Sequence, residues 1–367
     1  MMSPKAATCQ KYSRKGAFST KTFDNYRLPP SIVQTLVSAA NHSLAKSTWK
    51  SYKTAENHIK KCGKQTGIKL RFPFGNRETL TYVGWLLDVR KVAASTVEKY
   101  LSGVRLAHLK AGFTVPALKP DIIKAIIDGK AQSEKIKARL EGKAERLAVT
   151  PATLKLLKHE LKKCNWSLAK KRLTWLICTL AFNGSFRIGE LLSTDQNQFD
   201  PQTCLFGKDV SVENWAQGSE NTKLLKIWLK SPKELKFGKG IMVEVFETKN
   251  ELCPVAAYEK WRNISKVAKT STKPAFRLEN GLLYTGKQFN SDLQKLLGKH
   301  IDYKQTKILS HSFRAGLATA MAKLGYSDEE ICKIGRWNST AFVTYVKTAR
   351  IKRMKIAREM AKKLSDF

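Results

Sequence analysis

The sequence predicts a mostly α-helical protein with a small β-sheet, divided between a helical domain and an α+β domain. Three observations favour this fold class. The chain has 367 residues, of which 42% are apolar, so it can bury a core in each of two ordinary domains. Helical periodicity with capping signals covers most of the chain. Residues 224–247, by contrast, read as two strands joined by a lysine-rich turn.

The N-terminal part divides into an arm and a helical domain. Residues 1–30 are expected to form a flexible basic arm, because six basic side chains stand there against Asp24 alone. An inert, solvated tail would have the same composition. Residues 31–140 form the helical domain, in which Ser95 and Glu98 have the spacing of a capping box. One predicted helix face there carries Trp49, Tyr52, Ile59 and Cys62.

A polar, charged stretch separates this block from the second domain. We place the linker at 141–150 and the second domain at 151–367. Thr150 followed by Pro151 is typical of a helix N-cap and first helical position, so a helix should open the second domain. Residues 347–363 form a basic C-terminal helix with an apolar face, which could dock on a neighbouring copy or pack on its own domain.

The charge of the chain indicates a polyanionic partner. Lys and Arg number 67 against 30 Asp and Glu, a net charge of +37 that is spread along the length. Such an excess repels itself in a compact fold, and each phosphate that it neutralises releases counterions. Nucleic acid is therefore the first candidate partner. Basic ribosomal proteins and membrane-surface proteins share this composition, so charge alone selects no activity.

Cofactor signals are weak in this sequence. The seven cysteines are scattered, without zinc spacing, which favours reduced thiols in an intracellular protein, and no metal or other cofactor is predicted. No apolar run reaches the roughly 20 residues of a membrane span, and we expect no membrane association. Residues 281–287 match the start of a phosphate-binding P-loop, but the match fails at Gln288, so we expect a loop that enters a helix.

Tyr345 can be explained in two ways from its neighbourhood. Ser339 can cap a helix whose apolar positions Phe342 and Val346 lie four apart, so Tyr345 sits at the margin of a buried stripe. A packing role therefore suits it. Trp337 lies eight positions earlier, among lysines and arginines, where a tyrosine that attacks a phosphate would also fit.

Two further patterns place arginines where they could meet an anion. In HSFR, His311 and Arg314 are three apart and would share one helix face. In RIGE, Arg187 and Glu190 would share a face inside an apolar stretch, where the carboxylate can hold the guanidinium. A core histidine beside a surface arginine, and a plain buried ion pair, are the alternatives.

Together these residues resemble the tyrosine recombinase, or phage integrase-like, family. The resemblance runs through Arg187 with Glu190, a hairpin lysine, the HxxR of 311–314, Trp337 where many members have a second histidine, and Tyr345 at the nucleophile, over about 160 residues. The run from 311 to 347 looks closest to recombinases of crypton and DIRS-like mobile elements. The resemblance implies a helical core-binding domain followed by a tyrosine recombinase catalytic domain.

The resemblance also implies roles for these residues. Tyr345 would attack a DNA phosphodiester and form a 3′-phosphotyrosyl link, without ATP or metal. Arg187 and Arg314 would grip the phosphate oxygens, whose negative charge grows in the transition state. His311 is the candidate base, since a tyrosine pKa of about 10 leaves roughly one phenolate in a thousand at neutral pH, or about 4 kcal/mol to recover. Trp337 would donate a hydrogen bond to the phosphate.

The acid that protonates the leaving 5′ oxygen would be a lysine of the hairpin. Lys230, Lys233, Lys236 and Lys239 all lie in or beside the turn, and SPKELKFGKG matches the family pattern best if Lys233 is the acid. A solvated basic turn that touches the DNA backbone is the alternative for the others.

The predicted function is site-specific recombination of double-stranded DNA, for integration or excision of a mobile element. A homo-oligomer, a tetramer on paired sites, is expected, in the nucleus if the source is eukaryotic. A noncatalytic DNA-binding protein derived from such an element, and DNA relaxation of the type IB topoisomerase kind, remain as alternatives. A metal-dependent transposase or nuclease would need a carboxylate cluster, and no grouping in the sequence demands one.

Overall fold

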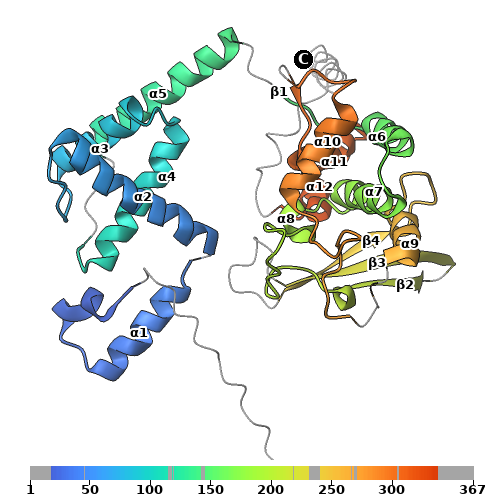
Figure 1. The fold of residues 1–367 in the computed structure, drawn as a ribbon, viewed down its shortest axis with the longest axis horizontal. Coiled ribbons are helices and arrows are strands. Elements are labelled where there is room, and N and C mark those ends of the chain that lie inside the picture. The colour runs from blue at the N-terminus through green and yellow to red at the C-terminus, as the bar shows by residue number, and fades with distance from the viewer. Residues whose placement is uncertain are drawn as a thin grey trace, which may run out of the picture. The chain divides into compact units, whose positions relative to one another are not determined.

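The computed structural model describes residues 18–44, 46–114, 118, 120–141, 145–217, 219–230, 240–265, 267, 271–303 and 306–337. The chain divides into two compact units, Met1–Gly142 and Lys143–Phe367, and the division falls in the linker predicted at 141–150. Most described residues are helical, and a three-stranded antiparallel sheet lies in the second unit, as the predicted fold class requires (Figure 1).

The first unit is helical throughout its described residues. Its elements are η1 (Thr20–Tyr26), α1 (Pro30–His42), α2 (Lys46–Thr66), α3 (Asn76–Asp88), α4 (Ala94–Lys110) and α5 (Asp121–Leu140). Helices α2 and α4 approach closely, since a Cβ added at Gly103 would lie 2.6 Å from the Ala55 Cβ. Apolar side chains at helical spacing form one core, which includes Ile59, Tyr82, Leu86, Val97, Leu101, Val104 and Ile123.

The start of α4 differs from the predicted capping box. The helix begins at Ala94 with Ala93 as its N-cap, and Ser95 lies inside the first turn. Thr96 donates its backbone N–H to the Ala93 carbonyl over 2.8 Å. The backbone therefore closes this turn itself, and Ser95 caps nothing.

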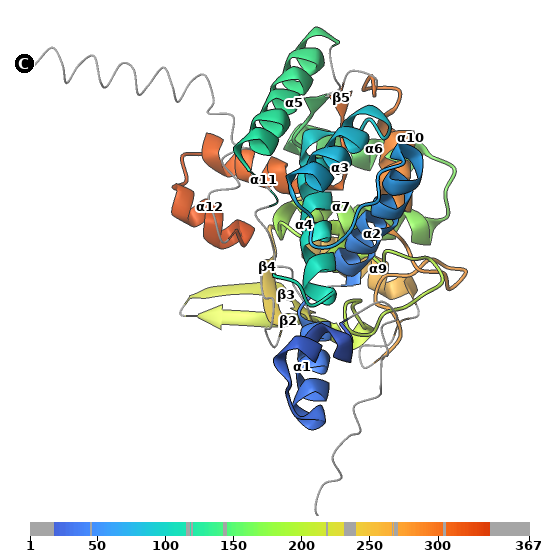
Figure 2. The same ribbon diagram turned by 90° about the vertical axis from the view of Figure 1, so that its left-hand side faces the viewer.

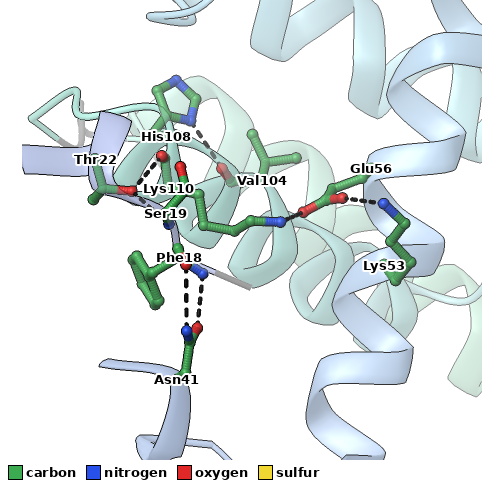
Figure 3. A network of polar contacts seen from close by, with 9 residues as sticks. All are labelled: Phe18, Ser19, Thr22, Asn41, Lys53, Glu56, Val104, His108 and Lys110. Carbon is green, nitrogen blue, oxygen red and sulfur yellow. Dashed lines mark hydrogen bonds and ion pairs between the residues drawn. The ribbon is translucent and has the colours of Figure 1, made fainter. Parts of the chain in front are cut away.

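Residues 18–30, expected in the basic arm, belong instead to the first folded unit. The Thr22 hydroxyl donates to the Lys110 carbonyl over 2.8 Å, and Phe18 and Asn41 exchange two hydrogen bonds (Figure 3). The last carbonyls of a helix have no partner within it, so the end of α4 offers acceptors to this segment. The Lys110 ammonium contacts Glu56 of α2 at 2.5 Å and ties the same end to a second helix. Residues 1–17 lie outside the described part.

The second unit contains the remaining elements. These are β1 (Glu145–Arg146), α6 (Pro151–Lys163), α7 (Leu168–Asn183), α8 (Ile188–Leu191), η2 (Gly207–Asp209), β2 (Val210–Gln217), β3 (Glu220–Leu229), β4 (Ile241–Phe246), α9 (Pro254–Ser265), α10 (Gly286–Leu297), β5 (Thr306–Lys307), α11 (Ser310–Lys323) and α12 (Asp328–Gly335). The helix predicted at the start of the second domain is confirmed as α6, because the Thr150 hydroxyl accepts from the Thr153 N–H and Pro151 is the first helical residue.

The sheet has the order β2, β3, β4, with both pairs antiparallel. Leu225 and Ile227 of β3 are fully buried, and their cross-strand partners Val245 and Val243 are buried beside them. Helix α9 lies next to the sheet (Figure 1). The predicted strands at 224–247 are therefore β3 and β4. The far ends of β2 and β3 pair beyond the reach of β4 and project from the unit (Figure 2).

Helix α11 is held tightly against the segment that precedes α6. The Val149 N–H donates to the Ser312 carbonyl over 2.9 Å, and a Cβ added at Gly316 would lie 2.0 Å from the Val149 carbonyl oxygen. Only glycine allows this approach. The close contact fixes the first turns of α11, which carry HSFR.

The P-loop-like residues form a helix start, as predicted. The Thr285 hydroxyl caps α10 by accepting from the Gln288 N–H over 3.1 Å, and Lys287 lies inside the helix. The side-chain oxygen of Gln288 in turn accepts a hydrogen bond from the Thr285 backbone N–H. This reciprocal capping uses the position where a P-loop needs a hydroxyl for magnesium. Among the described helices, none is both long enough and apolar enough to cross a membrane.

Candidate active site

The candidate site is built around a sharp turn between α7 and α8. Ser185 has a φ of 48°, in the left-handed region that is costly for residues other than glycine. Its side chain and that of Phe186 are fully buried. A Cβ added at Gly184 would lie 2.3 Å from the Phe186 ring. This turn aims the Ser185 carbonyl inward and brings Arg187 to the start of α8.

Arg187 and Glu190 form a capping box rather than one face of a helix. Arg187 is the N-cap of α8, and Glu190 is its third residue. The Glu190 carboxylate accepts the Arg187 backbone N–H over 2.9 Å and its guanidinium over 3.2 Å. The sequence predicted the pair correctly but placed Arg187 inside a helix, because the periodicity of 186–192 hides the turn. The Glu190 side chain is 8% exposed and that of Arg187 27% exposed.

Arg314 lies buried beside this turn. It is 3% exposed, on the second turn of α11, and it donates a hydrogen bond to the Ser185 carbonyl. Its guanidinium carbon lies 4.7 Å from the centroid of the Trp337 ring, a cation–π contact. Three segments that are far apart in the chain therefore meet at Arg314.

Trp337 lies two positions after the end of α12, next to the C-cap residue Arg336. Its backbone N–H donates to the Cys332 carbonyl over 3.0 Å, and its ring folds back over Gly335, where an added Cβ would lie 1.6 Å from a ring carbon. Any other residue at 335 would collide with the indole. The sequence predicted that Trp337 donates to the phosphate and packs so as to position the tyrosine helix, and that helix lies outside the described residues. The contact that the structure describes is with the Arg314 guanidinium.

His311 stands on the first turn of α11, one turn before Arg314. Its residue is exposed whereas Arg314 is buried, so the HxxR pattern places its two members at different depths. The predicted helix is confirmed. Because His311 is exposed, a ligand that enters from solvent can reach it.

Arg336 is the member of this cluster that sequence reasoning missed. Its guanidinium donates to Glu190 over 2.9 Å and to the Ser185 carbonyl over 3.3 Å, and it lies 4.8 Å from the Phe186 ring centroid. Its position beside Trp337 was the feature of the sequence that pointed to a role in the site. Arg336 was not predicted as a site residue because a charged residue in a basic stretch is usually solvated.

Two predicted site residues, Tyr345 and Lys233, lie outside the described residues. Of the four hairpin lysines, Lys230 alone is described. Its ammonium lies 2.9 Å from the Asp209 carboxylate, donates to the Cys204 carbonyl over 2.8 Å, and stands 3.2 Å from the Phe206 ring centroid. These contacts hold Lys230 at the base of the hairpin.

The electrostatic character of the cluster is positive. Arg187 and Arg336 share one carboxylate, that of Glu190, and Arg314 joins them at the adjacent turn through the Ser185 carbonyl. Two of these guanidinium groups point to the same backbone carbonyl. Such an arrangement suits a phosphate better than a neutral ligand. Within the part of the chain that the structure covers, no group of three or more His, Cys, Asp or Glu is placed to hold a metal ion.

Comparison with solved structures identifies the fold. No protein-family model matches the sequence, and no curated protein does. The XerH site-specific recombinase bound to a palindromic difH substrate is similar, with 11% identity, a TM-score of 0.55, and coverage of 90% of this chain and 85% of that one. The Tn1549 transposon integrase in complex with transposon right end DNA has 12% identity, a TM-score of 0.52, and coverage of 88% and 97%.

A lambda integrase dimer bound to a COC′ core site is also similar, with 12% identity, a TM-score of 0.51, and coverage of 86% of this chain and 76% of that one. The chain has the tyrosine recombinase fold. At these identities the likeness concerns the fold, and it spans both units.

Proposed function

We propose that this protein is a site-specific tyrosine recombinase that cuts and rejoins double-stranded DNA. The observation that carries the proposal is the meeting of separate segments at one turn: Arg314, with the Trp337 ring against it, donates to the Ser185 carbonyl, two residues before Arg187. Two guanidinium groups at one place, in a chain of net charge +37, suit the phosphate of a nucleic acid. The fold shared with the recombinases and integrases above agrees with this assignment.

The proposed reaction uses five side chains at one phosphate. The Tyr345 oxygen bonds to phosphorus, and the bond from phosphorus to the 5′ oxygen breaks. His311 accepts the phenolic proton, and Lys233 donates a proton to the leaving 5′ oxygen. Arg187 and Arg314 stabilise the additional charge on the nonbridging oxygens.

Trp337 orients Arg314 in this proposal by holding its ring against the guanidinium. The 3′-phosphotyrosyl link conserves the energy of the phosphodiester, so a second 5′ hydroxyl can reverse the steps and rejoin the strand. The proposed reaction therefore needs no ATP and no metal.

The proposed setting is a mobile element of the crypton or DIRS-like kind, which the run from 311 to 347 resembles. The enzyme would integrate or excise that element as a homo-oligomer, a tetramer on two paired DNA sites. It would act inside the cell, and in the nucleus if the source is eukaryotic.

The test is covalent capture on DNA. The full chain is incubated with a pool of duplexes that carry a randomised core and a nick, which lets the cut fragment diffuse away and traps the adduct. We expect a protein–DNA adduct that survives denaturation and forms in EDTA without ATP. Binding without an adduct would indicate the noncatalytic protein. Adducts with plasmid relaxation but no joined recombinant product would indicate the topoisomerase activity.

A further inference from the structure

Arg336 occupies a position that the mechanism above does not use. The residue follows α12, and its side chain is 13% exposed. One terminal nitrogen contacts three acceptors: Glu190 at 2.9 Å, the Ser185 carbonyl at 3.3 Å and the Gly184 carbonyl at 3.4 Å. Among these acceptors only Glu190 is charged, so the ion-pair partner of the Arg336 guanidinium is Glu190.

The backbone at Arg336 is in a conformation that favours glycine. Its φ is 54°, and that of Ser185, whose carbonyl it contacts, is 48°. Glycine at a helix C-terminus adopts this conformation without the steric cost that an arginine incurs. Two costly conformations thus meet at one hydrogen bond, which indicates that the side chain at 336 has a role in the site.

The charges explain what that role is. Glu190 holds Arg187 through two hydrogen bonds, but a carboxylate paired with one guanidinium cancels its positive charge. Arg336 supplies a second guanidinium to the same carboxylate. The three groups together keep a net charge of +1. Arg187 is then held in place by Glu190 while the cluster remains attractive to an anion.

We propose that Arg336 is a positioning residue for DNA cleavage: it offsets the charge of Glu190, so that Glu190 can hold Arg187 without cancelling the positive charge that the site presents to the scissile phosphate. This inference rests on the proposed recombinase function. It assigns Arg336 no contact with the DNA. Its effect should therefore depend on whether Glu190 carries a charge.

The test is a double-mutant cycle measured by single-turnover adduct formation, on a nicked duplex recovered from the randomised pool. Arg336→Gln should slow the reaction about 10- to 100-fold, which is the loss found when a residue that orients a metal ligand by a hydrogen bond is replaced. In the Glu190→Gln background the same change should cost less than about threefold, because no carboxylate charge is left to offset. Arg336→Lys, which keeps the charge, should be faster than Arg336→Gln.

Two controls separate this role from simple folding. Arg172→Gln removes an arginine of the same unit that donates to the Lys260 carbonyl over 2.8 Å, and it should react at the wild-type rate. Arg336→Gly suits the left-handed backbone, so it should fold normally and still react as slowly as Arg336→Gln. Thermal unfolding and DNA affinity are measured for every variant.

The outcomes are distinct. Three results would each overturn the inference: equal losses from Arg336→Gln in both backgrounds, equal rates for the Lys and Gln variants, or a wild-type rate for Arg336→Gln. In each case an adduct formed by the wild-type chain would leave the proposed function standing. Absence of any adduct from the wild-type chain would overturn the proposed function, and this inference with it.

Discussion

Arg314 donates a hydrogen bond to the backbone carbonyl of Ser185, which lies 129 positions earlier in the chain. The contact joins α11 to the turn that ends at Arg187. The two proposed phosphate-binding arginines are therefore linked through a backbone carbonyl of this turn, in addition to the Glu190 side chain that holds Arg187. A substitution can disturb the site by moving that turn, even where it leaves both arginines intact.

Arg314→Lys should reduce adduct formation about 100- to 1,000-fold, as the loss of a preorganised donor to a developing oxyanion does. Lysine keeps the charge, but it lacks the planar fork that can serve Ser185 and a phosphate together. Single-turnover cleavage measures the effect, with Arg262→Lys as the control, since Arg262 donates to the Val267 carbonyl elsewhere in the unit. Cleavage by Arg314→Lys at the wild-type rate would remove Arg314 from the proposed mechanism.

Lys230→Gln should preserve cleavage, whereas Lys233→Gln should abolish it. Lys230 is held by Asp209 and the Cys204 carbonyl, so its loss weakens the hairpin base and not the proton transfer. A duplex with sulfur in place of the scissile 5′ oxygen should restore cleavage by Lys233→Gln, because a thiolate leaves without a proton. Lys233 is not the acid if the sulfur duplex fails to restore cleavage by Lys233→Gln. The same conclusion follows if Lys230→Gln loses cleavage and regains it on that duplex.

Gly335→Ala should displace the Trp337 ring, since an added Cβ would lie 1.6 Å from one of its carbons. Overpacking of this kind costs about 1–3 kcal/mol, and Arg314 loses its cation–π partner. Urea unfolding and cleavage rates measure both effects. Gly189→Ala is the matched control, because nothing lies within 4 Å of its added Cβ. Unchanged unfolding and cleavage in Gly335→Ala would contradict the packing described.

The stability of the first unit should fall as pH drops below about 6.5, the ordinary pKa of histidine. His108 is buried, and its Nε2 accepts the Phe74 N–H over 2.8 Å. Its Nδ1 contacts the Val104 carbonyl at 2.8 Å (Figure 3). Burial lowers the pKa of His108, and it also lowers the pKa of His58. The unfolded chain then binds protons that the folded unit does not, so stability rises with pH below 6.5.

Urea unfolding between pH 5 and 8 tests this dependence. His108→Leu should be less stable at pH 8, where it leaves the Phe74 N–H without its acceptor, and should show a weaker dependence on pH than the wild type. A pH dependence equal to that of the wild type would show that His108 does not contribute.

The elements that sequence predicted well are those that local signals define. Thr150 with Pro151 marks the start of α6, the strand pattern at 224–247 marks β3 and β4, and HSFR lies on a helix as its spacing required. In each case the deciding information lies within a few residues. Strand β2 was missed, because its half-exposed sequence has no alternation strong enough to distinguish it from a loop.

The features that sequence could not predict depend on distant contacts. Arg187 caps α8 because Ser185 turns the chain, and that turn is stabilised by donors from 314 and 336. Arg336 looks like one basic residue among many until Glu190 is seen beside it. Residues 18–30 have the composition of an arm, yet the unpaired carbonyl end of α4 gives them a place to bind.

The central claim is that Tyr345 becomes covalently attached to DNA. The most direct measurement is mass spectrometry of the nuclease-trimmed and protease-digested adduct, which locates the nucleotide on one peptide. The account predicts a 3′-phosphonucleotide on Tyr345, and loss of the adduct with nearly unchanged DNA binding in Tyr345→Phe. A nucleotide on another residue, or an adduct that persists in Tyr345→Phe, would contradict it.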